Sequence, residues 1–282
     1  MSRWRFLLGL FGIVLFFGVL SLGFYLWLTP EHTRLWELGQ EHLPVAHIED
    51  DVLSIGNVRD FTWSLEGATE RSDGKYETRT YHLDQVQGID VYISHFSSFE
   101  GLAHIFLSFT FADSDPLVLS VESRREVGES FSPWKGLFAQ YELMVVAGTE
   151  RDLVGVRGNV RQERLYRYPT VATPEIAREL LNGLVTDMQM IERAPRFYHT
   201  LTNNCTNFVT RRVAKATGVE FPLTWKSVFP GYFETVLLKL GLLQIDQDTA
   251  WNKERYIIQH IPALDDPDFS QHLRDQKFQN NS

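Results

Sequence analysis

The chain has 282 residues, of which 44% are hydrophobic and 22% charged, and its formal net charge is −9. This much apolar sequence suffices for one sizeable core. The acidic balance argues against nucleic acid as a partner. The single cysteine, Cys205, excludes an internal disulfide and a zinc site built from several cysteines. No phosphate-binding loop, dinucleotide fingerprint or HExxH motif occurs, so we expect neither a cofactor nor a metal.

The N-terminal segment is strongly apolar. Residues 6–28 read FLLGLFGIVLFFGVLSLGFYLWL without a charge, and as a helix they would span about 35 Å. Arg3 and Arg5 precede this run, so the positive-inside rule places the N-terminus in the cytoplasm and the main domain outside. The alternative is a cleaved signal peptide, but the run is longer than usual and lacks an A-x-A-like site. We interpret residues 1–29 as a cytoplasmic start and a single-pass signal anchor in the inner membrane.

The rest of the chain divides into three parts. Residues 30–51 are interpreted as a juxtamembrane linker, 52–270 as an extracytoplasmic domain and 271–282 as a polar tail. Seven runs in the domain have strand character: Tyr76–Leu83, Ile89–Phe96, Leu102–Phe111, Leu117–Arg124, Tyr141–Ala147, Asp152–Arg157 and Leu165–Tyr168. Their connections are too short for crossover helices, so we predict a mostly antiparallel sheet.

Helices follow the strands. Thr173 and Pro174 are typical of a helix start, and apolar residues then recur at helical spacing as far as Ile191. A second helix begins at Cys205 and ends at Gly218. Tyr232 to Leu240 form a short third helix. The predicted fold is therefore α+β, with an antiparallel sheet packed against helices.

Cys205 lies at the start of its helix and on the buried stripe. Asn204, a preferred N-cap, precedes it. The unpaired N–H groups and the positive end of the helix dipole stabilise a thiolate at this position. The alternative is an inert buried cysteine, which is common. A catalytic role requires a histidine from another element.

His104 is the best candidate among nine histidines, with His82 and His95 also on strands. Ala103 and Ile105 belong to an apolar face of the strand, and His104 lies on the other face. If Phe111 faces Leu117 on the next strand, Glu122 lies on the same face as His104 and diagonally from it. In that position the Glu122 carboxylate could orient the His104 ring. The alternatives are a core histidine bonded to a backbone carbonyl and an ordinary salt bridge from Glu122 to Arg124.

Several of these segments together resemble the Lnb N-terminal periplasmic domain family. The resemblance rests on four segments and covers roughly 52–270: Ala103–Phe109, Leu119–Glu126, Glu150–Asp152 and Asn203–Thr206. It implies a permuted papain-like (NlpC-type) fold in which the histidine precedes the cysteine. It also implies Cys205 as nucleophile, His104 as base and Glu122 as the acidic strand position.

The family takes its name from a lipoprotein acyltransferase that carries further membrane segments, which this chain lacks after Leu28. We therefore expect a membrane-anchored, thiol-dependent acyltransferase or hydrolase acting on a lipid or lipoprotein ester or amide. The Cys205 N–H, aided by Asn204 or Tyr198, would hold the oxyanion. The partners would be the bilayer and lipoproteins, phospholipid or peptidoglycan peptide. The alternatives are a cell-wall peptidase or amidase on the same fold and a non-catalytic envelope binding module.

Overall fold

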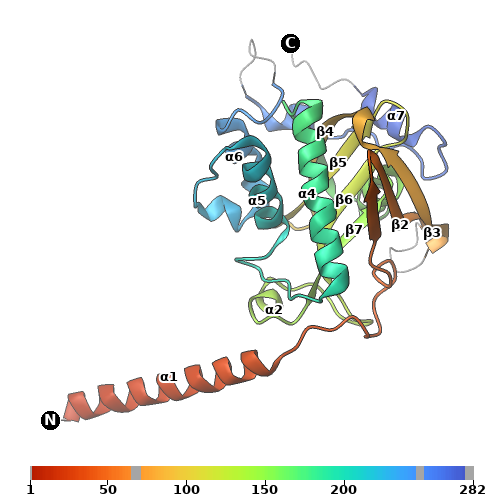
Figure 1. Ribbon diagram of the computed structural model, residues 1–282. Helices are drawn as coiled ribbons and strands as arrows, with labels where there is room; N and C mark the ends of the chain where they lie inside the picture. Colours follow the sequence, from red (N-terminus) through yellow and green to blue (C-terminus); the bar gives the residue numbers. More distant parts are fainter. Residues whose placement is uncertain (1, 65–70, 246–250, 277–282) are drawn as a thin grey trace.

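The computed structural model describes residues 2–64, 71–245 and 251–276 (Figure 1). These residues form a mixed α+β structure around one eight-stranded sheet, in the order β1-β2-β7-β6-β5-β4-β8 with β3 paired to β2. The strands are β1 (Val45–Glu49), β2 (Val52–Trp63), β3 (Arg71–His82), β4 (Val86–His95), β5 (Ala103–Phe111), β6 (Leu117–Arg124), β7 (Glu142–Gly148) and β8 (Arg164–Pro169). All pairings are antiparallel except the short contact of β2 with β7. The predicted antiparallel sheet is confirmed.

Two strands went unrecognised in the sequence. β1 lies inside the segment 30–51 that we interpreted as a linker, and it pairs along its full length with β2. β2 itself is interrupted by a register shift between Ile55 and Val58, where Asn57 has a positive φ of 60°. This bulge breaks the apolar alternation that identifies a strand.

The predicted strand Asp152–Arg157 is wrong. These residues belong to helix α3 (Glu150–Gly155) and to the π-helical turn Val156–Val160. The Thr149 hydroxyl caps α3 by accepting the Asp152 N–H at 3.2 Å. An N-cap threonine followed three residues later by an acidic residue was a helix signal that the short apolar run obscured.

Helices cover both faces of the sheet (Figure 1). One face carries α4 (Pro174–Arg193), α5 (Cys205–Thr217) and α6 (Glu234–Lys239), and α4 crosses the sheet in the foreground of the figure. The other face carries α3 and α7 (Phe269–Arg274). The alternation along β5 explains this division, because Ile105 joins the core under α4 and α5 whereas Phe106 joins the core under α3 and α7.

The C-terminal segment departs from the expected polar tail. In α7, Phe269 is 3% exposed and Leu273 is 1% exposed. Arg274 forms an ion pair with Glu150, which is fully buried. Phe269 belongs to the expected domain 52–270, whereas Leu273 and Arg274 belong to the expected tail 271–282, whose polar composition concealed one buried apolar residue and one member of a buried charge pair. Residues 277–282 of the expected tail lie outside the described residues.

The N-terminal helix α1 (Ser2–Trp27) projects away from the domain (Figure 1). Over the residues that the structure describes, no helix combines the length and apolar character needed to cross a membrane. The following segment packs on the domain. Trp36 is 6% exposed and lies under the guanidinium of Arg124, 4.1 Å from its ring centroid.

A buried ion pair fixes α3 to the sheet. Both Asp152 carboxylate oxygens accept hydrogen bonds from Arg59, at 2.8 and 3.0 Å. The same carboxylate also accepts the Phe61 N–H at 3.0 Å and the Trp63 indole N–H at 2.8 Å. Asp152 is fully buried and Arg59 is 5% exposed. Every strong acceptor position of the carboxylate is used, so the pair is satisfied despite its burial.

We expect Asp152→Ala to lower the free energy of unfolding by about 3–5 kcal/mol, because it leaves the Arg59 charge buried without its partner. The matched control is Asp115→Ala, whose side chain is 80% exposed and lies 3.8 Å from Arg79. That change should stay within about 0.5 kcal/mol. Urea unfolding followed by circular dichroism measures both. Equal effects of the two substitutions would contradict the structural role of Asp152.

Candidate active-site cleft

Strands β5 and β6 separate at one end of the sheet. Their ladder runs from Phe109↔Leu117 to Phe106↔Ser120 and stops there. Beyond this point β5 stays paired with β4, and β6 stays paired with β7. Helix α5 contacts both strands. The divergence opens the sheet beside the start of this helix.

A cleft of about 410 Å³ occupies this opening and reaches both faces of the sheet. Ala103 and Val121 line it from the face that carries α5, and His104 and Glu122 line it from the opposite face. Five predicted site residues border this one cleft, namely Tyr198, Asn204, Cys205, His104 and Glu122. The structure thus brings together side chains that come from β5, β6, α5 and the loop before α5.

Asn204 positions the start of α5. Its Oδ1 accepts the Asn207 N–H at 2.8 Å, and its Nδ2 donates to the Thr200 carbonyl at 2.6 Å. The predicted N-cap is confirmed. The amide oxygen and one of the two Nδ2 N–H groups thus hold the helix start and the preceding loop. The role of Asn204 as an oxyanion donor stays a prediction.

Cys205 is 4% exposed, and burial raises the pKa of its thiol above the ordinary value. The backbone N–H groups of Ile105 and Thr206 oppose this shift without outweighing it. The expected thiolate is therefore wrong for the resting protein, because desolvation exceeds the effect of the helix start. Within the described chain, no hydrogen bond joins Cys205 to His104, and the raised pKa keeps the Cys205 thiol neutral at neutral pH.

His104 belongs to a hydrogen-bonded relay. Its Nε2 lies 2.7 Å from the Ser120 hydroxyl, which in turn donates to Glu122 Oε1 at 2.9 Å. A hydroxyl that donates to a carboxylate accepts from the imidazole, so we assign the proton to Nε2. Nδ1 is then left as a proton acceptor. Glu122 Oε1 lies 3.8 Å from His104 Nε2, which is too long for a hydrogen bond, so Glu122 orients the ring through Ser120.

The register of β6 explains this arrangement. We expected Phe111 to face Leu117, but Leu117 pairs with Phe109. A shift of two residues keeps every side chain on its predicted face, whereas a shift of one would not. Continuing the pair Phe106↔Ser120 by two residues along each strand brings Glu122 directly across from His104.

Arg157 completes the relay and was missed in the sequence. Its Nη2 donates to Glu122 Oε1 at 2.9 Å, and its Nη1 donates to the Leu153 carbonyl at 2.8 Å. Its guanidinium lies 4.8 Å from the Phe106 ring centroid. Arg157 holds the pKa of Glu122 well below the usual range despite burial. The mistaken strand prediction for this segment hid the residue, and the π-helical turn that begins at Val156 carries it to the cleft.

Burial and the neighbouring Arg157 charge together lower the pKa of His104 to about 4, because they outweigh the opposing effect of Glu122. The ring is therefore neutral at neutral pH. A neutral imidazole and a neutral thiol that border one cleft fit general-base activation during attack rather than a resting ion pair.

His199 and His82 lie outside the cleft, whereas Tyr198 borders it. His199 Nδ1 faces its own loop and accepts the Leu201 N–H at 3.2 Å. His82 pairs with Asp113 at the surface. Tyr198 is 7% exposed, and burial and the nearby Cys205 raise the pKa of its phenol. Over the described residues, no cluster of three or more His, Cys, Asp or Glu side chains could hold a metal ion.

His95 is 6% exposed and does not border the cleft. Within the described chain, its Nδ1 has no hydrogen-bond partner. Its Nδ1 lies 3.8 Å from Glu100, and its ring packs edge-on against Tyr166. Of the strand histidines considered in the sequence, His104 is therefore the one that the structure places in the cleft.

Acidification should destabilise the fold through His104. The unfolded chain binds a proton near pH 6.5 and the folded chain only near pH 4, so the unfolded state holds more protons between these values. The free energy of unfolding should fall by about 2–3 kcal/mol as pH drops through this window. His104→Asn should lack this part of the loss.

The control for this pH dependence is His82→Asn. The His82 ring is exposed, and its hydrogen bond to Asp113 raises its pKa, whereas the pKa of His104 is lowered. This variant should keep the loss of stability on acidification. Parallel stability profiles for the wild type and His104→Asn would show that the ring is not held neutral by the fold.

The model of the Lnb N-terminal periplasmic domain matches residues 72–231, more than half of the chain. This match contains His104, Ser120, Glu122, Arg157 and Cys205, and it indicates a periplasmic, envelope-associated protein. Comparisons with curated proteins and with solved structures found no match. The chain belongs to the Lnb N-terminal periplasmic domain family.

Proposed function

We propose that this protein is a periplasmic, thiol-dependent acyl-transfer enzyme with Cys205 as nucleophile and His104 as base. The observation that supports this most strongly is the cleft at the β5–β6 divergence, which both side chains border. The substrate class is an ester or amide of a lipid or lipoprotein. The chain order, with a histidine strand before a cysteine helix, is that of a permuted papain-like enzyme.

The reaction begins with transfer of the Cys205 thiol proton to His104 Nδ1, directly or through one water molecule in the cleft. The sulfur attacks the carbonyl carbon and forms a tetrahedral oxyanion, which accepts hydrogen bonds from the Cys205 N–H and the Tyr198 hydroxyl. The protonated His104 then gives its proton to the leaving oxygen or nitrogen. The product is a thioester on Cys205.

The second half returns the enzyme to its resting state. Water or an amine, deprotonated by His104, attacks the thioester and displaces the Cys205 sulfur, which recovers the proton. Hydrolysis and acyl transfer differ only in this acceptor. The Ser120–Glu122–Arg157 relay keeps the ring in the tautomer that leaves Nδ1 free.

Site substitutions test this mechanism with p-nitrophenyl butyrate as acyl donor. Cys205→Ala should remove turnover and the acyl adduct seen by intact-mass spectrometry. His104→Asn should lower kcat/KM by about 10²–10⁴, as expected for loss of a general base. Ser120→Ala should lower it roughly tenfold, which corresponds to one hydrogen bond.

The matched control for Ser120 is Ser123→Ala. Ser123 lies on the same strand and borders the same cleft, but it occupies the other sheet face. This variant should retain near wild-type turnover. An adduct that forms as fast in His104→Asn as in the wild type would overturn the assignment of the base. Release of muropeptides without any lipid-derived adduct would favour a cell-wall peptidase or amidase instead.

We further propose that helix α1 anchors the domain to the inner membrane. In support, residues 6–28 carry no charge, and the apolar side chains Leu7, Phe11 and Val19 are 57%, 66% and 61% exposed. Transfer of such apolar side chains from water into the bilayer is favourable.

A charge placed in this helix tests the anchor. The double substitution Phe11→Arg and Val19→Arg should move the protein from the membrane to the soluble fraction, because each central arginine costs about 2.5–3.5 kcal/mol in a bilayer. The control is Leu35→Arg, which lies beyond the helix at a position 75% exposed. Alkaline-carbonate extraction followed by immunoblotting measures the distribution. Membrane retention of the double variant would exclude the anchor.

A further inference from the structure

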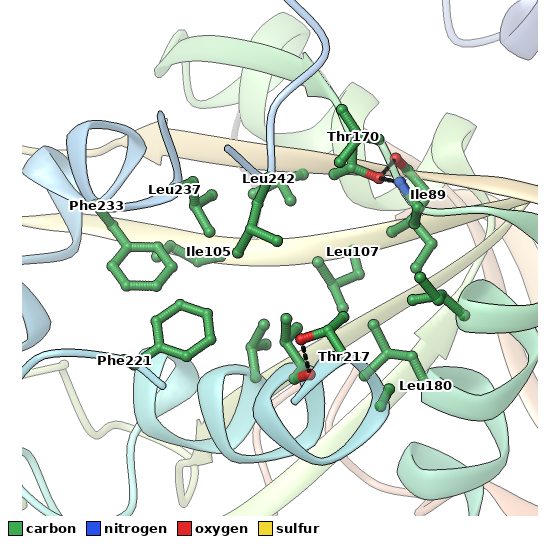
Figure 2. A pocket seen from close by; sticks show the side chains of 17 residues that line it. Ile89, Ile105, Leu107, Thr170, Leu180, Thr217, Phe221, Phe233, Leu237 and Leu242 are labelled. Carbon is green, nitrogen blue, oxygen red and sulfur yellow. Dashed lines mark hydrogen bonds between the residues drawn. The ribbon is translucent and has the colours of Figure 1, made fainter. Parts of the chain in front are cut away.

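A second cavity lies on the α5 face of the sheet, away from the cleft (Figure 2). It measures about 160 Å³ and is enclosed by β4, β5, α4, α5 and the segment 221–242. Leu107, Leu180, Phe221 and Leu237 point into it from these different elements (Figure 2). Its lining combines buried side chains of the main core with partly exposed ones, among them Val171, which is 50% exposed.

The cavity offers no hydrogen bond to a ligand. Two of its lining side chains carry hydroxyls, and both are already engaged. Thr170 donates to the Ile89 carbonyl at 2.8 Å, and Thr217 donates to the Val213 carbonyl at 2.7 Å (Figure 2). A buried water needs two to four polar partners, whereas an aliphatic cavity of about 150 Å³ stays dry and admits a molecule the size of benzene. The fitting occupant is hydrocarbon of about six carbons.

The cavity lies next to Cys205 along the same helix. Val209, Val213 and Ala216 line it from α5, roughly 6 to 16 Å along the helix axis from Cys205. On the strand side, Ile105 directs its side chain to the cavity, and its backbone N–H interacts with the Cys205 sulfur.

We propose that this cavity receives the hydrocarbon end of a linear acyl chain whose carbonyl carbon lies at Cys205. This inference rests on the acyl-transfer function proposed above, and it identifies long-chain acyl groups as the preferred class of donor. The chain runs from the sulfur between β5 and α5, past Ile105 and Val209. Each methylene that it buries favours binding by about fourfold.

Filling the cavity tests the inference. Ala216→Phe places an aromatic ring in the space, and Ala214→Phe introduces the same ring on the same helix at a position outside the lining. Both changes are made in the Cys205→Ser background, so that binding is measured without chemistry. Isothermal titration calorimetry with dodecanoate should show at least about tenfold weaker binding for Ala216→Phe and a change within about twofold for Ala214→Phe.

Thermal unfolding identifies variants that fail to fold. If Ala216→Phe does not fold, Val213→Leu adds a smaller group at a second lining position and should weaken dodecanoate binding by about fourfold. The proposal would be overturned if the Cys205→Ser protein did not bind dodecanoate. It would also be overturned if the folded Ala216→Phe or Val213→Leu variant bound dodecanoate as tightly as the Cys205→Ser protein, and the cavity would then be a packing void.

A second readout separates this inference from the proposed function. In proteins that retain Cys205, Ala216→Phe should lower the ratio of kcat/KM for dodecanoyl over acetyl p-nitrophenyl esters at least about tenfold, while acetyl turnover stays close to the wild-type value. Dodecanoate binding that depends on Ala216 in a protein without turnover would support the cavity and refute the enzyme. Turnover with an unchanged chain-length ratio would refute the cavity and support the enzyme.

Discussion

The separation of β5 from β6 after the pair Phe106↔Ser120 governs the arrangement of this domain. A continuous ladder would seal the sheet and keep His104 and Cys205 on opposite sides of a closed wall. Because each strand keeps its outer partner, the opening costs few backbone hydrogen bonds. The Ile105 N–H, which lies just beyond the last pair of the ladder, interacts with the Cys205 sulfur. The same opening thus creates the cleft and positions the thiol.

Buried charges behind the cleft make this opening rigid. Arg157 contacts Glu122, the Leu153 carbonyl and the Phe106 ring, so the residue that fixes the relay also ties it to α3. Helix α3 is held in turn by Asp152 on Arg59 and by Glu150 on Arg274. The segment Glu150–Asp152, which contributed to the family resemblance, therefore supports the site from a distance and borders no part of it.

Helix α5 contributes residues to both the cleft and the apolar cavity. Its first residue borders the polar cleft, and its later apolar residues line the dry cavity. The buried stripe of an amphipathic helix usually fills its core completely. Here small residues such as Ala216 leave space beside Phe221 and Leu237. Under the proposed function, the helix presents the reacting carbonyl at its start and accommodates the acyl chain along its side.

The sequence alone determined the local features of this protein. It placed five strands at nearly their observed positions, the helix from Cys205 to Gly218 with its Asn204 cap, and His104 and Glu122 on one sheet face. These follow from side-chain periodicity and capping, which depend on neighbours in the chain. Tertiary structure decided the rest: the end of the β5–β6 ladder, the placement of Ser120 between His104 and Glu122, the arrival of Arg157, and the neutral thiol. These features arise only when distant segments pack together, as in the contact of Arg157 with Glu122, which are more than thirty residues apart. No local sequence pattern encodes strand divergence, burial or such contacts.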